Sequence, residues 1–249
     1  MSRLLAAALF VSQVLSAVGP TPPAADARVV GGVRPIVVGV DVGSLRPPIV
    51  WRPIPYGPRR LRQMAAYSKR HYGRWSWHLD DPKVIVEHYT TGTTFQGAWN
   101  TFASNALHLG EKPGTCAHFV IDRDGTIYQL ARLSVRCRHV VGMNHVAIGI
   151  EHVGTSSAQV LGNHRQMAAS LRLTLWLMAK FGINVGNVIG HAEALQSPYH
   201  HELYLSWRCL VHADFPHWAM YEYRHRLRRL ARAQGVPAGA APVWVPSGC

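Results

Sequence analysis

Fifteen histidines stand against thirteen carboxylates in this chain, and the positions of three of the histidines suggest chemistry. His88 closes a β-branched run, His191 follows a short apolar run, and His212 lies with Asp214 in a segment before the last helical pattern. Side chains at the ends of neighbouring strands can converge on one point although they are far apart in sequence. Since a lone histidine is usually a structural residue, these positions predict a metal site only if one sheet joins them.

Four short apolar runs are candidates for the strands that would position these residues. The second run leads into the turn Asp122–Gly125 and then into a further apolar stretch, which predicts a hairpin with Gly125 in a positive-φ conformation. The near-continuous apolar character of the runs indicates a sheet covered on both faces. The runs are Val84–Val86, His118–Ile121, Val146–Ile150 and Val188–Ile189.

Two helices are predicted from the spacing of apolar residues. Met167–Phe181 carries leucines at helical spacing before Gly182, and a second amphipathic run covers residues 217–233. Strands that alternate with helices, without a strict βαβ repeat, predict an α/β fold. With 249 residues, 48% of them hydrophobic, we expect one main domain, residues 75–233, in which helices flank a central mixed β-sheet and the site lies at strand ends.

The flanking segments have different compositions. Residues 1–27 resemble an export signal, because a basic residue precedes the apolar run Leu4–Val18 and small residues follow it. This run is shorter than the roughly 20 apolar residues that a membrane span needs, although an N-terminal membrane anchor is the alternative. Residues 28–74, rich in proline and glycine, predict an extended arm, and residues 234–249 predict a tail of the same kind. We therefore expect a secreted or wall-associated protein with no stable membrane span.

The net charge of +13 predicts attraction to polyanions. For an exported protein these are anionic wall polymers rather than chromosomal DNA. Charge alone leaves a nucleic-acid binder open as an alternative, but no motif of that class is present, so we expect no nucleic-acid partner. A cluster of arginines near the C-terminus predicts either a solvated helix face or a dedicated anion site. Its members are Arg224, Arg226, Arg228, Arg229 and Arg232.

The four cysteines contain no C-x-x-C pair, which argues against a four-cysteine zinc knuckle. Export would permit disulfides, and Cys116 and Cys137 flank one strand-and-loop unit, so we expect them to be bonded. The alternative is that they are small buried apolar residues.

Four strings, taken in order, resemble the type 2 N-acetylmuramoyl-L-alanine amidase family, which shares its fold with peptidoglycan recognition proteins and phage lysozyme-type amidases. The resemblance spans residues 80–230. Each string alone is weakly specific, but the ordered set is highly specific. The strings are Val84–Thr90, Ala117–Ile127, Ile148–Glu151 and Ile189–Glu193.

The resemblance implies zinc-dependent hydrolysis of the amide bond between N-acetylmuramic acid and L-alanine, with peptidoglycan or its muropeptides as substrate. It also implies that His88 and His191 bind Zn²⁺, that Asp214 is the third ligand, and that Glu151 is the catalytic carboxylate. His212 stands where the family often has a catalytic lysine.

This chain departs from the family pattern in the long gap before Asp214, which leaves His212 or His200 as alternative third ligands. Two imidazoles and one carboxylate would leave a coordination position on zinc for water, as in hydrolytic sites. His212 is expected to donate a hydrogen bond to the developing oxyanion.

On a buried strand, Glu151 is expected to have a raised pKa that suits proton transfer, the alternative being a structural pair with an arginine. His139 and Asn144 precede that strand and predict a substrate groove, or else the packing of their own loop. A non-catalytic peptidoglycan-binding module is the competing function, and the complete ligand set favours the enzyme.

Overall fold

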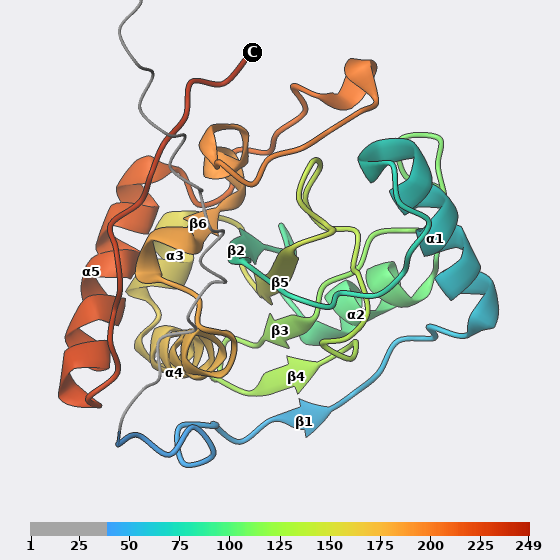
Figure 1. Ribbon diagram of the computed structural model, residues 1–249. Helices are drawn as coiled ribbons and strands as arrows, with labels where there is room; N and C mark the ends of the chain where they lie inside the picture. Colours follow the sequence, from blue (N-terminus) through green and yellow to red (C-terminus); the bar gives the residue numbers. More distant parts are fainter. Residues whose placement is uncertain (1–38) are drawn as a thin grey trace, which may run out of the picture. The chain divides into compact units, whose positions relative to one another are not determined.

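The computed structural model describes residues 39–249, so the expected signal segment and the first part of the expected arm lie outside it. Six strands form one mixed sheet in the order β1-β4-β3-β5-β2-β6, with helices around it (Figure 1), which confirms the predicted fold class. The β3–β4 pair is antiparallel and the other four pairs are parallel. The strands are β1 Val50–Trp51, β2 Val84–Tyr89, β3 Phe119–Ile121, β4 Ile127–Gln129, β5 Ala147–His152 and β6 Val188–Gly190.

Both faces of the sheet are covered, as the apolar runs predicted. In β3, Phe119 and Ile121 join the cluster that includes α4 and α5, while Val120 joins a second cluster with residues of α2. This alternation follows from the two-residue period of a strand. Figure 1 shows α4 and α5 on one side of the sheet and α2 on the other. The helices are α1 Pro58–Tyr72, α2 Phe95–Ala103, α3 Ser157–Gly162, α4 His164–Phe181 and α5 His217–Ala233.

The hairpin predicted at Asp122–Gly125 joins β3 to β4. The amide of Asp122 donates to the carbonyl oxygen of Thr126 at 2.9 Å, and Gly125 has a φ angle of +92°. A Cβ atom at residue 125 would lie 2.9 Å from the carbonyl oxygen of Arg165, so glycine also permits the close approach of α4. The predicted long helix is likewise confirmed, and Gly182 ends it with a φ angle of +67°.

The segment predicted as an extended arm contains a helix, α1. Pro58 occupies its first turn, where the missing N–H costs no hydrogen bond, and Gly73 ends it with a φ angle of +76°. Met64 and Tyr67 on this helix are fully buried. The prolines that favour an extended chain therefore precede the helix or begin it, while the domain boundaries themselves stay predictions.

The tail after α5 is held by backbone hydrogen bonds. The amide of Val185 donates to the carbonyl oxygen of Ala238 at 2.8 Å, and the amide of Val245 donates to that of Gln196 at 2.9 Å. A disulfide between Cys209 and Cys249 fastens it further. Among the described residues, every helix is too short or too polar to traverse a lipid bilayer.

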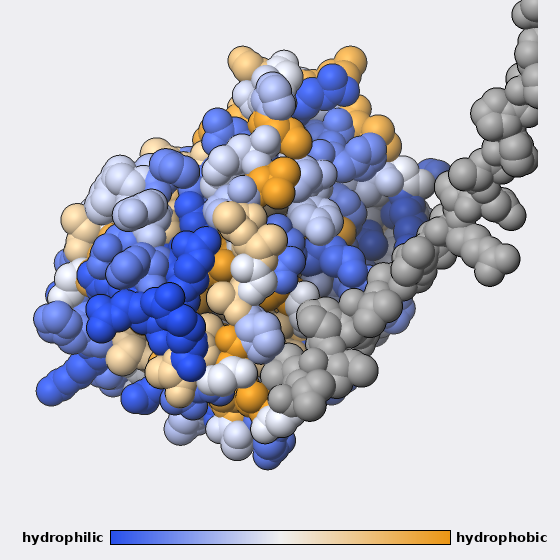
Figure 2. Space-filling model, turned by 60° about the vertical axis from the view of Figure 1, so that its left-hand side comes forward, coloured by the Kyte–Doolittle hydropathy of each residue, from blue (hydrophilic) through white to orange (hydrophobic). Residues whose placement is uncertain are grey.

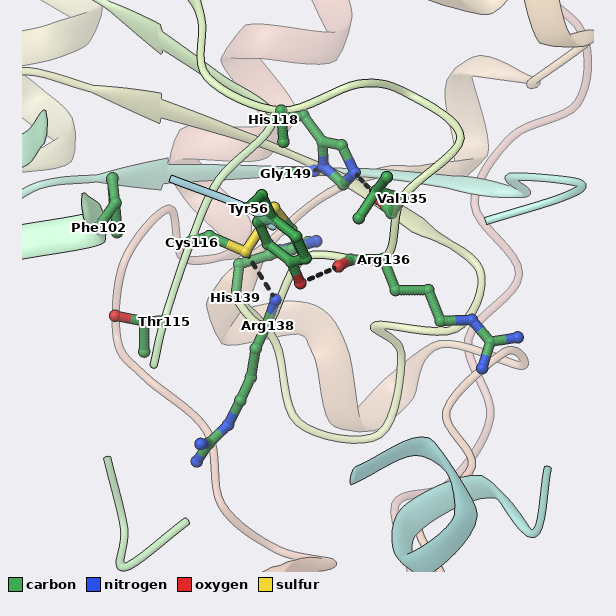
Figure 3. Close-up of a disulfide and its surroundings, with 12 residues drawn as sticks. Tyr56, Phe102, Thr115, Cys116, His118, Val135, Arg136, Arg138, His139 and Gly149 are labelled. Atoms are coloured by element: carbon green, nitrogen blue, oxygen red, sulfur yellow. Dashed lines mark hydrogen bonds between the residues drawn. A yellow bond between two sulfur atoms is a disulfide. The ribbon is translucent and has the colours of Figure 1, made fainter. Parts of the chain in front are cut away.

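The expected disulfide between Cys116 and Cys137 is present, and both residues are buried (Figure 3). Beside it, the hydroxyl of Tyr56 donates to the carbonyl oxygen of Arg136 at 2.7 Å. His118 accepts a hydrogen bond from the amide of Gly149 at 3.0 Å, which links the entry of β3 to β5. This region fixes the loop that leads toward the candidate site.

Candidate active site

Three side chains from distant parts of the sequence meet beyond the ends of β2 and β6. The Nδ1 atom of His88 lies 3.1 Å from Nδ1 of His191 and 3.0 Å from Oδ2 of Asp214. The Nδ1 atom of His191 lies 3.5 Å from Oδ1 of Asp214. All three residues are buried, and within residues 39–249 no other three His, Cys, Asp or Glu side chains bring ligand atoms as close together as this group does.

The sheet and one glycine produce this convergence. Since β2 pairs in parallel with both β5 and β6, the strand ends that carry His88 and precede His191 lie at the same edge. Asp214 arrives from a loop whose backbone passes directly over Gly190, where a Cβ atom would collide with the carbonyl oxygen of Phe215. The amide of Ala192 donates to the carbonyl oxygen of Asp214 at 3.0 Å. Glycine at residue 190 is therefore required to place the third side chain.

The group fits a tetrahedral zinc ion. Atoms bound to zinc at about 2.0–2.1 Å lie roughly 3.3 Å from one another in tetrahedral geometry. The two imidazole nitrogens are separated by a similar distance, 3.1 Å, and each lies within 3.5 Å of one oxygen of the Asp214 carboxylate. Burial lowers the pKa of His88 to about 4, which keeps its imidazole neutral, as a metal ligand must be. Although burial raises the pKa of Asp214, hydrogen bonds from His191 and His88 hold it well below its usual range. The donor set is thus one carboxylate and two imidazoles.

Glu151 faces the same cavity from β5. Its Cα atom pairs with that of His88 in the strand register. Its Oε2 atom is buried without a hydrogen-bond partner, and the carboxylate forms no ion pair with any residue from 39 to 249. Burial, and secondarily the charge of Asp214, raises the pKa of Glu151 to about 8. The alternative of a structural pair with an arginine is therefore not observed in the described part of the chain.

His139 contacts His88 on the ring nitrogen that does not face His191 and Asp214. Its Nδ1 atom lies 3.0 Å from Nε2 of His88, so it can accept the Nε2 proton and leave the Nδ1 lone pair of His88 free for a cation. The ring fits because residue 149 is glycine: a Cβ atom there would lie 2.7 Å from the imidazole. Burial lowers the pKa of His139 well below its usual value. His139 also lines the cavity, so its predicted contact with substrate remains open.

Asn144 is fully buried and hydrogen-bonded within the protein. Its Oδ1 atom accepts hydrogen bonds from the amides of His139 at 2.8 Å and Val140 at 2.9 Å. Its amide nitrogen donates to the hydroxyl of Tyr72 at 3.2 Å. The geometry therefore favours the loop-packing alternative for Asn144, which positions His139.

His212 lies at the edge of the group, with its side chain exposed. Its ring stacks on that of His191, with centroids 4.6 Å apart and an interplanar angle of 14°. Burial of part of the ring lowers the pKa of His212, and repulsion by His191 adds to this effect. His200 instead packs over Gly142. The geometry thus favours Asp214 as the third ligand over both alternatives.

A cavity of about 910 Å³ opens in front of these groups. One wall was not predicted from the sequence: the loop Thr90–Thr94, which follows β2 and leads into α2. Thr94 caps α2 by accepting a hydrogen bond from the amide of Gly97 at 3.2 Å. The threonines around Gly92, which begin two residues after His88, are the sequence feature that could have predicted a polar wall here.

Comparison with known proteins agrees with the ordered motifs. Residues 78–201 match the sequence profile of the family described as N-acetylmuramoyl-L-alanine amidase. No curated protein matches the chain.

Solved structures with similarity include the N-acetylmuramoyl-L-alanine amidase LysC from Clostridium intestinale URNW, 20% identical over 74% of this chain and 99% of that chain, with a TM-score of 0.46. A mutant endolysin from Bacillus subtilis is 25% identical over 58% of this chain and 83% of its own, with a TM-score of 0.39. The E. coli amidase AmiD, in complex with an anhydro-muropeptide substrate, is 23% identical over 45% and 49%, with a TM-score of 0.37. From the profile match and the ordered motifs, this chain belongs to the type 2 N-acetylmuramoyl-L-alanine amidase family.

Proposed function

We propose that this protein is a zinc-dependent amidase that hydrolyses the bond between N-acetylmuramic acid and L-alanine in peptidoglycan. One observation carries the proposal: the buried group of His88, His191 and Asp214 shares its cavity with the unpaired carboxylate of Glu151. A module that only binds wall fragments has no use for a complete ligand set with a free carboxylate beside it. An amidase therefore accounts for this site better than a binding module does.

His88, His191 and Asp214 would hold the ion. When bound, zinc supplies a Lewis acid that polarises the amide carbonyl and makes a water molecule more acidic. The protein fixes the ligands beforehand, since His139 orients His88 and Gly190 admits the segment that carries Asp214. Such prior placement reduces the reorganisation needed during the reaction.

Glu151 moves the proton in this proposal. As water attacks the carbonyl carbon, its proton passes to the Glu151 carboxylate, and as the C–N bond breaks, Glu151 delivers that proton to the departing amine nitrogen of L-alanine. A carboxyl group whose pKa burial has raised to about 8 both accepts and releases a proton near neutral pH. His212, stacked on His191 at the cavity edge, is assigned to donate an N–H to the carbonyl oxygen as negative charge develops there.

The surface charge supports a polyanionic wall as the working environment. On α5, Arg224 is used internally in an ion pair with Glu193 at 2.7 Å, whereas Arg229 and Arg232 are exposed. Figure 2 brings forward the side of the molecule on which Figure 1 places α5, and hydrophilic residues cover much of it. Two disulfides are usual in an oxidising compartment, which supports secretion.

The test is digestion of purified muropeptides followed by mass spectrometry, with zinc supplied and with a chelator. The expected products are a free stem peptide with an L-alanine amino terminus and a sugar with a free lactyl carboxylate. His88→Ala should abolish this cleavage, whereas His164→Ala, an exposed histidine at the start of α4, should not. Tight binding of intact muropeptide without cleavage, in the zinc-loaded protein, would instead establish the binding module.

A further inference from the structure

Large apolar side chains are exposed on two segments at the cavity mouth. We name these segments the apolar rim, and its members are Leu107, Leu109, Leu203, Tyr204, Leu205, Leu210 and Val211. Leu109, Leu210 and Val211 line the cavity itself, so the rim reaches its entrance. Figure 2 shows hydrophobic residues at the top of the molecule, where Figure 1 places the loop that follows η2, His191–Gln196. Exposed apolar residues gathered on one part of a surface indicate an interaction surface.

The rim is rigidly supported from below. The carboxylate of Glu202 lies 2.8 Å from Nδ1 of His71, and the amide of Leu203 donates to the backbone carbonyl of His71 at 3.0 Å. The ring of Trp207 is buried against His71, with centroids 4.7 Å apart. The disulfide at Cys209 fixes the end of the loop. Because these contacts fix the loop, its leucines are held at the protein surface.

The surroundings of the rim are basic. From Leu203 to Ala213 the sequence contains no carboxylate, and it carries the exposed Arg208. Helix α1, which contacts this loop through His71, also has no carboxylate between Pro58 and Tyr72. Its exposed cations, with the one that follows the helix, are Arg59, Arg62, Lys69, Arg70 and Arg74. Within residues 39–249, Arg70 is the one of these that pairs with a carboxylate, that of Glu111, at 2.7 Å.

We propose that the apolar rim docks the protein on a lipid bilayer that carries anionic headgroups, with the cavity mouth toward the bilayer. Aliphatic side chains enter the boundary between headgroups and acyl chains, while flanking Lys and Arg bind the headgroups. A second copy of this chain fits less well, because it would bring two surfaces of the same positive sign together. Combined with the proposed function, on which this step rests, docking presents the cavity to muropeptides at the membrane surface.

The experiment measures co-sedimentation of the full chain with vesicles of phosphatidylcholine and phosphatidylglycerol in a roughly 2:1 ratio, and with phosphatidylcholine alone. The rim variant is Leu203→Asp with Leu205→Asp, two residues outside the cavity lining that are 47% and 72% exposed. The matched control is Val50→Asp with Trp51→Asp on β1, 47% and 51% exposed. Thermal unfolding verifies that both variants fold.

The wild type and the β1 control should bind the anionic vesicles, and the rim variant should bind at least about tenfold more weakly. Cleavage of soluble muropeptide should be the same in all three proteins. The proposal is overturned if the wild type ignores anionic vesicles or if the rim variant binds as well as the wild type. A wild-type dimer that the rim variant fails to form would assign the surface to a second copy. Because the vesicle assay needs no substrate, it tests the docking proposal even if the protein proves to have no amidase activity.

Discussion

The Nδ1 atoms of His88 and His191 lie 3.1 Å apart at the ends of two neighbouring parallel strands. Two imidazole nitrogens at this distance share at most one proton, whereas a cation between them satisfies both lone pairs together with the carboxylate of Asp214. This relationship is the basis of the first two predictions.

His88→Ala and His191→Ala should each lose bound zinc, because two protein ligands hold the ion far more weakly than three. The measurement is metal content by mass spectrometry after dialysis against a weak chelator. His164→Ala, whose side chain is exposed on α4, is the control and should keep about one zinc per chain, as the wild type is expected to do. Full zinc occupancy in the His191 variant would contradict the proposed zinc site.

The third ligand can be separated from its neighbour two residues earlier. Asp214→Ala should lose zinc, whereas His212→Ala should retain it and lose turnover by about 10²–10³, the usual effect of removing an oxyanion donor. Zinc content and kcat of both variants give the answer. Zinc loss in the His212 variant, with zinc retained in the Asp214 variant, would show that His212 is the third ligand and Asp214 is not.

Glu151→Gln should keep the metal while kcat falls by about 10²–10⁴, because the amide is nearly isosteric but cannot carry the proton. KM should change much less than kcat. Steady-state kinetics with soluble muropeptide, alongside metal analysis, test this. A Glu151→Gln enzyme with near wild-type kcat would mean that another group transfers the proton.

Glu87 provides a test of how pH affects stability. It is fully buried on β2, accepts a hydrogen bond from Thr174 at 3.0 Å, and burial raises its pKa to about 8. Between the ordinary pKa of a glutamate and about 8, the Glu87 carboxyl group therefore keeps its proton in the folded chain and loses it in the unfolded chain. The stabilisation that comes from this difference is complete at acid pH and is lost as pH rises toward 8.

Glu87→Gln should remove that loss. Relative to the variant, the wild type should become less stable between pH 5 and pH 8 by at most about 4 kcal/mol. Urea unfolding of both proteins at the two pH values measures the difference. Glu222→Gln, at a partly exposed carboxylate paired with Arg226, is the control and should show no comparable trend. A constant difference between wild type and Glu87→Gln across this range would contradict the prediction.

Helix α1 should behave as part of the core. Met64→Ala should lower the free energy of unfolding by about 2–5 kcal/mol, because it leaves a cavity beneath a fully buried side chain. Arg62→Ala on the exposed side of the same helix should change it by less than about 0.5 kcal/mol. Equal effects of the two substitutions would show that α1 contributes little to the fold.

Local patterns were sufficient to predict the central strands, the Asp122–Gly125 hairpin and helices α4 and α5. Each of these is encoded within a few residues, by β-branched runs, by a glycine that takes a positive φ, or by helical spacing of apolar residues. The local pattern does not reveal helix α1, because prolines dominate the segment before it and the proline at its first position continues that pattern.

The candidate site was predicted less completely, for a physical reason. The ends of parallel strands predict that His88 and His191 approach each other, since neighbouring strands share an edge. The position of Asp214 depends on a contact between Gly190 and Phe215, which no local pattern reveals. The tight packing of Asn144 likewise depends on Tyr72, which lies in a segment with no predicted helix.

The bond between Cys209 and Cys249 closes a covalent ring that contains α5 and the tail, with 40 residues of sequence separation between its ends. A protease that cuts one peptide bond inside this ring leaves both pieces linked, so the nicked chain gains only one water in mass. Such cleavage is silent on a non-reducing gel and becomes visible when a thiol is added. The ring also includes Asp214, so a cut between Cys209 and Asp214 leaves this side chain covalently attached to the rest of the protein.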